Sequence, residues 1–339
     1  MRLTYAVFLP MILLALSGTA RAGEELNIYS ARHYQTDERL YATFERQTGI
    51  RINRLEGEGD ALVARIRQEG AYSPADILIT VDAGRLWRAE EAGLFQPVSS
   101  AILEARIPAN LRHPEGEWFG FSTRARMIFV NPDLVDPAQV QSYRDLADPR
   151  LKGQICIRSS SNIYNLSLMG AMIAHLGEEG ALDWAKGVVA NFARKPQGGD
   201  TDQIRAAAAG RCGVAVANSY YFARLMASED PEDRAAAAAL VPVFPDQQGV
   251  GTHVNVSGAG VLKHAPNREA AVRFLEYLAS DEAQRWFAEG NHEYPAVRGV
   301  AHDEALSRLG TFRADDLNVA TLGENQPLSQ RLMDLANWP

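Results

Sequence analysis

Residues 118–131 have the sequence WFGFSTRARMIFVN, and this stretch decides the fold. It is rich in aromatic and β-branched residues and contains no helical spacing of apolar residues, which is typical of β-strands. We therefore expect a pair of strands here. Because α/β segments are predicted on both sides of the stretch, these strands are expected to run between two domains.

The chain before this stretch alternates short apolar runs with amphipathic segments. Strands are predicted at residues 26–29, 51–55 and 76–81, and helices at residues 37–47, 60–69 and 83–92. A glycine follows each of the three helices, as is common at helix ends. Strands that alternate with helices in this way indicate βαβ units and a parallel sheet.

A second α/β series follows the stretch. Its predicted strands cover residues 154–158, 213–217, 241–244 and 254–262. Its predicted helices cover residues 163–176, 178–192, 201–209, 267–278 and 281–289. The chain is thus expected to fold as two α/β lobes rather than one.

The predicted fold class is α/β, with two lobes of the type II-like periplasmic-binding-protein kind. Each lobe is an open mixed sheet flanked by helices, and crossing β-strands join the two. Residues 23–121 and about 250–300 are expected in the N-terminal lobe, and residues from about 122 to 249 and 301–339 in the C-terminal lobe. Two lobes joined in this way can close on a ligand held in the cleft between them.

The first 22 residues have the features of a cleaved signal peptide. Arg2 is followed by a mostly apolar run from Leu3 to Leu16, and residues 20–22 (ARA) match the A-x-A cleavage pattern. A membrane span is the alternative interpretation. The run is shorter than the roughly 20 residues that cross a bilayer, and Pro10 interrupts it. We therefore expect export of the mature chain.

Composition and charge exclude several classes of protein. The chain has 339 residues, of which 46% are hydrophobic and 22% charged, as is ordinary for one large or two medium globular domains. Its formal net charge is −8, and removal of the two arginines of the signal peptide makes it −10. Nucleic acid is therefore not an expected partner, because its phosphates require a basic surface.

Two cysteines, Cys156 and Cys212, each lie in a short apolar segment predicted to be a buried strand. In an oxidising compartment, one disulfide between neighbouring strands is the favoured interpretation, with about 4 kcal/mol of stabilisation in the chain-entropy model. Two buried free thiols are the alternative. A metal site built on cysteines would have too few ligands.

Sequence motifs of the common enzyme classes are absent. The chain has no G-x-S-x-G, no H-E-x-x-H, no P-loop and no dinucleotide-binding glycine pattern. No pair of nucleophile and base stands out either. We therefore predict a protein that is not an enzyme.

Four tyrosines, Tyr34, Tyr164, Tyr220 and Tyr221, each follow a predicted strand. In open α/β sheets ligands bind outside the carboxyl ends of the strands, so these side chains could converge on one cleft. Tyrosine is also a common packing residue, and a tyrosine doublet can arise by chance. The spacing by itself leaves both interpretations open.

Four segments of the chain resemble the transferrin-like ferric-binding proteins of bacterial ABC iron importers. They are residues 29–37 (YSARHYQTD), 73–97 (SPADILITVDAGRLWRAEEAGLFQP), 153–165 (GQICIRSSSNIYN) and 218–225 (NSYYFARL). The resemblance extends through nearly the whole mature chain. An N-S-Y-Y doublet with an upstream S-x-N-x-Y is a specific combination.

The resemblance implies a set of metal ligands. Tyr220 and Tyr221 match the tyrosine pair of the family, and Tyr164 and Tyr34 match the additional tyrosines of its tyrosine-rich branch. The chain departs from the branch that uses His, Glu, Tyr and Tyr, because Tyr34 stands at the position of that histidine. The neighbouring His33 is a candidate fifth ligand, although adjacent residues of an extended segment point in opposite directions.

Asp82 lies near the position of the family's glutamate. An aspartate at this place suits another role, because the helix predicted from residue 83 begins directly after it. Asp82 is therefore expected to cap that helix rather than to bind metal.

The chemistry of phenols agrees with the Fe³⁺ that the resemblance implies. A phenol ordinarily has a pKa near 10, so ionising one at pH 7 costs about 4 kcal/mol. A strongly charged cation that prefers hard oxygen donors can offset this cost. Four phenolates around Fe³⁺ leave one excess negative charge, which Arg124 and Arg224 could neutralise from beside the ligands. Surface salt bridges are the alternative for both arginines, and Fe²⁺ is less favoured because it would leave a larger excess.

The expected function is that of the periplasmic substrate-binding component of an ABC iron importer. The expected partners are the iron ion and an inner-membrane ABC permease, and the protein is expected to be a monomer. Because iron binding releases phenolic protons, the affinity should fall as the pH falls. The alternative is a solute-binding protein for another small ligand, such as a polyamine, thiamine or an oxyanion, with the tyrosines as an aromatic box.

Overall fold

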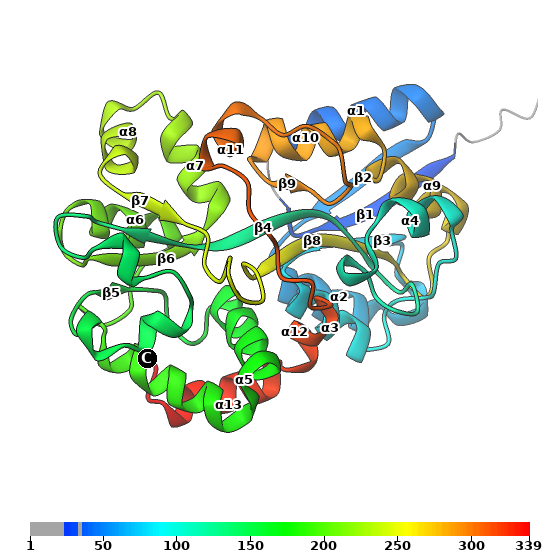
Figure 1. The fold of residues 1–339 in the computed structure, drawn as a ribbon. Coiled ribbons are helices and arrows are strands. Elements are labelled where there is room, and N and C mark those ends of the chain that lie inside the picture. Colours follow the sequence, from blue (N-terminus) through cyan, green and yellow to red (C-terminus); the bar gives the residue numbers. More distant parts are fainter. Residues whose placement is uncertain (1–23, 33–35) are drawn as a thin grey trace, which may run out of the picture.

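A computed structural model of the protein describes residues 24–32 and 36–339. Within these residues, nine strands are connected by pairing. Seven of them follow the order β2-β1-β3-β8-β4-β6-β5, and the other two, β7 and β9, pair with β4. Helices surround the strands on both sides of the molecule (Figure 1). The strands are β1 (Glu25–Ser30), β2 (Arg51–Glu56), β3 (Ile77–Val81), β4 (Phe119–Val130), β5 (Ile155–Cys156), β6 (Val214–Asn218), β7 (Val241–Val243), β8 (Val254–Val261) and β9 (Tyr294–Pro295).

β4 joins the two halves of the molecule. Its first part, from Phe119 to Ala125, pairs with β8, and its second part, from Arg126 to Val130, pairs with β6, both antiparallel. Figure 1 shows this strand crossing from one half to the other. The sequence-based prediction of a pair of strands here was wrong. The polar residues 122–124 at its middle are buried, and they contact other buried groups instead of turning the chain toward solvent.

The first unit is built on β1, β2, β3, β8 and the beginning of β4. β1 runs parallel to β2 and β3, while β3 runs antiparallel to β8, so the sheet is mixed as predicted. Its core contains Ile28 from β1, Phe44 from the first helix and Phe274 from a helix late in the chain. Segments far apart in the sequence therefore form one hydrophobic core.

The second unit is built on β5, β6, β7 and the end of β4. β5 and β6 are parallel, and β6 and β7 both pair with β4. Its longest helix, α5 (Ile163–Ala190), is interrupted at Gly177, whose φ of 72° and ψ of 173° are not helical. This break confirms the predicted division between a helix over residues 163–176 and another from residue 178.

The C-terminal helices lie against both units. α12 packs on α3 and α5, and α13 packs on α5. The lobe boundaries near residues 121, 249 and 300 stay a prediction.

The α-helices are α1 (Asp37–Thr48), α2 (Gly59–Glu69), α3 (Ala83–Glu91), α4 (Ala101–Arg106), α5 (Ile163–Ala190), α6 (Asp200–Ala208), α7 (Ser219–Ala227), α8 (Pro231–Ala238), α9 (Arg268–Leu278), α10 (Asp281–Asn291), α11 (Glu304–Leu309), α12 (Ala320–Glu324) and α13 (Gln326–Leu335).

A disulfide joins Cys156 and Cys212, which confirms the pairing favoured from the sequence. Cys156 is the last residue of β5, and Cys212 stands two residues before β6, so the bridge ties two neighbouring parallel strands. Their Cα atoms are 6.0 Å apart. The predicted signal peptide lies outside the described residues, and among those described no helix is long and apolar enough to span a membrane.

Candidate metal centre

Two helices of the second unit begin at the same edge of its sheet. α5 begins at Ile163 after β5, and α7 begins at Ser219 directly after β6. Because β5 and β6 are parallel, their carboxyl ends lie at one edge, and the first turns of both helices lie there too. Tyr164 stands in the first turn of α5, and Tyr220 and Tyr221 stand in the first turn of α7.

The structure brings these three tyrosines together. The hydroxyl oxygens of Tyr164 and Tyr220 lie 3.3 Å apart, although 56 residues separate them in the chain. The rings of Tyr220 and Tyr221 have their centres 4.2 Å apart. Tyr220 is buried, with 3% of its surface exposed, and the other two are partly buried. Phenol oxygens this close together can share one cation.

Four arginine side chains surround the tyrosine cluster. A guanidinium group near an aromatic ring is attracted to its face and also favours negative charge on the phenol oxygen. The predicted charge-neutralising residues, Arg124 and Arg224, both lie beside Tyr220, while two further arginines lie beside Tyr164. The guanidinium carbons lie 5.8 Å (Arg124) and 5.1 Å (Arg224) from the ring centre of Tyr220, and 5.8 Å (Arg126) and 5.7 Å (Arg158) from that of Tyr164.

A buried carboxylate fixes the arginines beside Tyr164. Asp200 begins α6 and accepts a bond of 2.6 Å from Arg126, while Nη1 of Arg158 lies 3.8 Å from its other oxygen. Arg126 also donates to Asn165, at 2.8 Å, and to Asn218, at 3.1 Å. Asn165 lies in the first turn of α5, and Asn218 directly precedes α7, so both stand where the tyrosine-bearing helices begin. The same bonds therefore position both the charges and the phenols.

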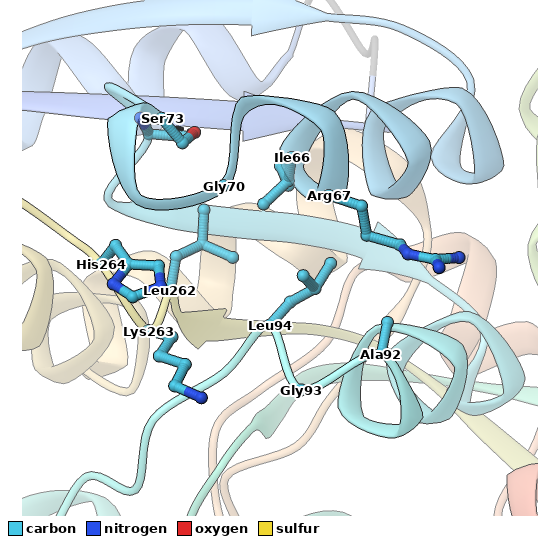
Figure 2. Close-up of a pocket in the computed structure, with 11 residues that line it drawn as sticks. Ile66, Arg67, Gly70, Ser73, Ala92, Gly93, Leu94, Leu262, Lys263 and His264 are labelled. Carbon is cyan, nitrogen blue, oxygen red and sulfur yellow. Dashed lines mark hydrogen bonds between the residues drawn. The ribbon is translucent and has the colours of Figure 1, made fainter.

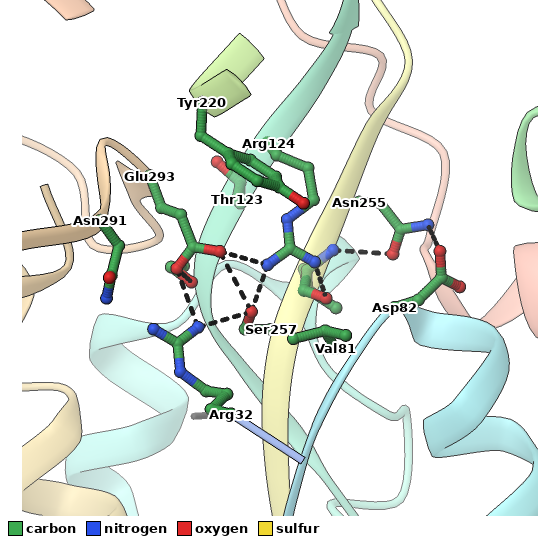
Figure 3. A network of polar contacts seen from close by, with 12 residues as sticks. Arg32, Val81, Asp82, Thr123, Arg124, Tyr220, Asn255, Ser257, Asn291 and Glu293 are labelled. Carbon is green, nitrogen blue, oxygen red and sulfur yellow. Dashed lines mark hydrogen bonds and ion pairs between the residues drawn. The ribbon is translucent and has the colours of Figure 1, made fainter. Parts of the chain in front are cut away.

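Asp82 caps α3, as predicted. Its carboxylate accepts a hydrogen bond of 2.9 Å from the backbone N–H of Gly84, and its φ of 79° is unusual for a residue other than glycine. It also accepts a bond of 2.6 Å from Ser167 of α5. Figure 3 shows a further contact, a bond of 3.0 Å from Asn255 of β8. Burial raises the pKa of Asp82 against the opposing effect of these hydrogen bonds. Asp82 therefore links the first unit to α5 of the second unit.

Tyr34 and His33 lie outside the described residues, so their roles stay predictions. Within residues 24–32 and 36–339, no three His, Cys, Asp or Glu side chains are grouped in a way that could hold a metal ion.

A surface pocket of about 230 Å³ lies elsewhere on the first unit (Figure 2). Gly70 and Ser73, which precede β3, and Leu262, Lys263 and His264, which follow β8, line part of it. Asp82 follows the other end of β3. The pocket therefore opens at the edge of the sheet opposite to Asp82, and it is not part of the tyrosine cluster.

Sequence reasoning missed several charged residues of this region. Arg158 ends a predicted strand directly before the polar run that precedes Tyr164, and this position could have drawn attention to it. Arg126 interrupts an apolar run, which is a signal of a buried charge with a partner. Asp200 and Glu293 have no such local signal, because their arginine partners are distant in the sequence. Arg32 pairs with the distant Glu293 and also with Asp37, five residues later.

Two α/β units joined by a shared strand, with polar side chains gathered where the units meet, define a protein that holds a small ligand between lobes. Residues 73–313 match the family model described as bacterial extracellular solute-binding protein, and the chain belongs to this family. Iron uptake proteins A1 and A2 of Synechocystis are 50% and 54% identical to it, over 95% and 92% of this chain and 90% of each relative.

Solved structures give the same result for the fold. The FutA protein of Trichodesmium, in complex with iron and citrate ligands, superposes with a TM-score of 0.91 and is 54% identical, over 93% of this chain and 100% of that one. The ferric binding protein from Campylobacter jejuni has a TM-score of 0.87 and 39% identity, over 93% of this chain and 100% of its own. The two-lobe α/β fold expected from the sequence is confirmed.

Proposed function

We propose that the protein captures Fe³⁺ in the cleft between its two units and delivers it to an inner-membrane ABC permease. It acts as the substrate-binding component of an iron importer and catalyses no reaction. The observation that carries the proposal is the meeting of three tyrosines, in which the hydroxyl oxygens of Tyr164 and Tyr220 lie 3.3 Å apart.

The charges around the cluster suit a cation held by phenolates. Four arginines lie beside the tyrosine rings: Arg124, Arg126, Arg158 and Arg224. Glu293 forms an ion pair with Arg124, and Asp200 forms one with Arg126. Positive charge beside the rings favours anionic phenol oxygens. Phenolates are hard donors that match Fe³⁺, and its three charges offset most of the negative charge that they bring.

The proposed ligand set is Tyr34, Tyr164, Tyr220 and Tyr221, with His33 as a further candidate. Tyr34 follows β1 in the sequence and is proposed as the ligand from the first unit, while the other three stand on helices of the second unit. An ion bound by both units has a higher affinity for the closed arrangement than for an open one, so binding favours closure. The relatives of the chain, which are iron uptake and ferric iron-binding proteins, support this choice of ligand.

The proposed site of action is the periplasm. Residues 1–22 have the composition of a cleavable signal peptide, and relatives with 26% identity include an Fe(3+)-binding periplasmic protein from Serratia marcescens. We propose that the mature protein works as a monomer and meets the permease through its two units.

The test is a titration of the purified protein with ferric citrate, followed by absorption spectroscopy. Tyrosinate bound to Fe³⁺ gives a red or orange charge-transfer band, which the wild-type protein should develop with one iron per chain. Tyr221→Phe removes one phenol oxygen and should weaken the band and the affinity. Tyr72→Phe is the matched control, because Tyr72 is 96% exposed and lies away from the cluster.

A colourless wild-type protein without measurable iron affinity would sink the proposal. Tight binding of a polyamine, thiamine or an oxyanion to that metal-free protein would favour the alternative of an aromatic box for another solute. An identical loss of colour in Tyr72→Phe and Tyr221→Phe would show that the band does not depend on the cluster.

A further inference from the structure

Glu293 is a buried carboxylate between two arginines (Figure 3). It follows α10 in the first unit, and its side chain is 1% exposed. Nη2 of Arg124 lies 2.5 Å from Oε1, and Nη1 of Arg32 lies 2.8 Å from Oε2. Each carboxylate oxygen thus serves a different arginine. The hydroxyl groups of Ser122 and Ser257 donate to the same carboxylate, at 2.9 and 3.3 Å.

The electrostatics of this group favour a permanent negative charge. Burial alone would raise the pKa of Glu293, but the charges of Arg32 and Arg124 outweigh that effect and lower the pKa to about 2. Glu293 is therefore ionised at neutral pH. A fixed charge in a buried place can set the position of a mobile cationic side chain.

Arg124 connects this carboxylate to the tyrosine cluster. It stands on β4, and its guanidinium group donates to the backbone carbonyl of Val256 at 2.8 Å and also to Ser257. The same group lies 5.8 Å from the ring centre of Tyr220. Glu293 is thus connected to the tyrosine cluster through one intervening side chain, that of Arg124.

We propose that Glu293 is a positioning residue of the iron site, which holds Arg124 against Tyr220. The inference rests on the proposed function, because it assigns a role within the same site. Glu293 has no contact with the metal in this role. It sets the environment of one ligand, as residues behind metal ligands commonly do.

The two oxygens of Glu293 make the inference testable by conservative substitution. Glu293→Gln has the same shape but a single acceptor oxygen, so one of the two arginines loses its acceptor on this side chain and the negative charge is removed. Glu293→Asp keeps the charge and both acceptors on a side chain that is one methylene shorter. The two variants therefore separate loss of charge and pairing from a small change of position.

The experiment measures the charge-transfer maximum of the ferric complex and the iron affinity by competition with citrate. For Glu293→Gln we expect a shifted maximum and an affinity lower by about tenfold or more, in the range that residues behind metal ligands control. Glu293→Asp should recover most of both. In the background of Arg124→Gln, adding Glu293→Gln should change neither quantity, because Glu293 acts through Arg124.

Glu90→Gln is the matched control, since Glu90 is also a hydrogen-bonded carboxylate of the first unit. It accepts a bond of 2.8 Å from Trp118 and pairs with His113 at 3.3 Å. It should lower thermal stability without moving the absorption maximum. If Glu293→Gln behaves in the same way, Glu293 is only structural and the inference is wrong.

The remaining outcomes are also decisive. If Glu293→Gln does not fold, the comparison of Arg124→Gln with the double variant decides the question, because the double variant removes a pair of opposite charges. A further spectral shift in the double variant would overturn the inference. A wild-type protein without the ferric band would refute the proposed function itself, whereas a normal wild-type band with an unchanged Glu293→Gln band refutes this inference alone.

Discussion

His253 lies directly before β8, beside the strand that joins the two units, and only 4% of its surface is exposed. Burial, together with the nearby charges of Arg126 and His175, lowers its pKa to about 3. In the unfolded chain a histidine binds a proton near pH 6.5. Between these two values the unfolded state binds more protons than the folded one, so stability falls as the pH falls.

We predict that His253→Gln reduces the acid sensitivity of the protein. In the wild type, the pKa of His253 is about 6.5 in the unfolded chain and about 3 in the folded protein. Lowering the pH from 7 to 5 should therefore reduce the free energy of unfolding by about 2 kcal/mol through this group. Urea unfolding at the two pH values measures this difference for both proteins. An equal loss in wild type and variant would show that other groups cause the acid sensitivity.

At this scale, the sequence indicated the tyrosines better than it indicated their surroundings. Tyr164, Tyr220 and Tyr221 follow strands, but this spacing alone left open whether they meet, and the resemblance of their motifs to the ferric-binding family favoured a common site. Glu293 follows a helix and Asp200 begins one, and neither stands in a motif. Their arginine partners are 169 and 74 residues away in the chain. Such pairs cannot be predicted from local spacing, because only the tertiary fold creates them.

Among the elements, β5 is the shortest strand that supports the cluster, with two residues. The predicted strand over residues 154–158 was therefore too long at both ends. Its position relative to β6 depends on few ladder hydrogen bonds, and the disulfide from Cys156 to Cys212 adds a covalent connection between the two strands. The bridge compensates for the short ladder.

Removal of this bridge by the double variant Cys156→Ala/Cys212→Ala is expected to cost about 4 kcal/mol of unfolding free energy, because the closed loop contains 56 residues. Urea unfolding of the oxidised wild type and of the variant measures the difference. The wild type with a reduced bridge is the control and should match the variant. A loss below about 1 kcal/mol would mean that the loop is already restricted in the unfolded chain.

The elements with a regular pattern were predicted well, and those with buried polar groups were not. The helices after β1, β2 and β3 have clear apolar spacing, and their predicted limits agree with the structure to within one residue. β4 was predicted as a pair of strands, yet it is one continuous strand in which the polar residues from Ser122 to Arg124 are buried. A contact such as that of Ser122 with Glu293 cannot be recognised from local sequence.

For the whole molecule, iron binding should raise the temperature of unfolding. A ligand at 100 times its dissociation constant adds about 2.7 kcal/mol to the folded state, which corresponds to several degrees for a chain of this size. Differential scanning calorimetry with and without ferric citrate measures the rise. Tyr164→Phe/Tyr221→Phe should lose most of it, and Tyr72→Phe should keep it. An equal rise in all three proteins would place the iron outside the tyrosine cluster.

The position of β8 in the sheet has a consequence for the order in which the chain can fold. β8 lies between β3 and β4, but it is made of residues 254–261. While a ribosome synthesises the chain, β3 and β4 both keep an unpaired edge until those residues have emerged. Unpaired edges invite association with other chains. A chain that ends before residue 254 should therefore aggregate, and the first unit can be completed only after most of the second unit has been synthesised.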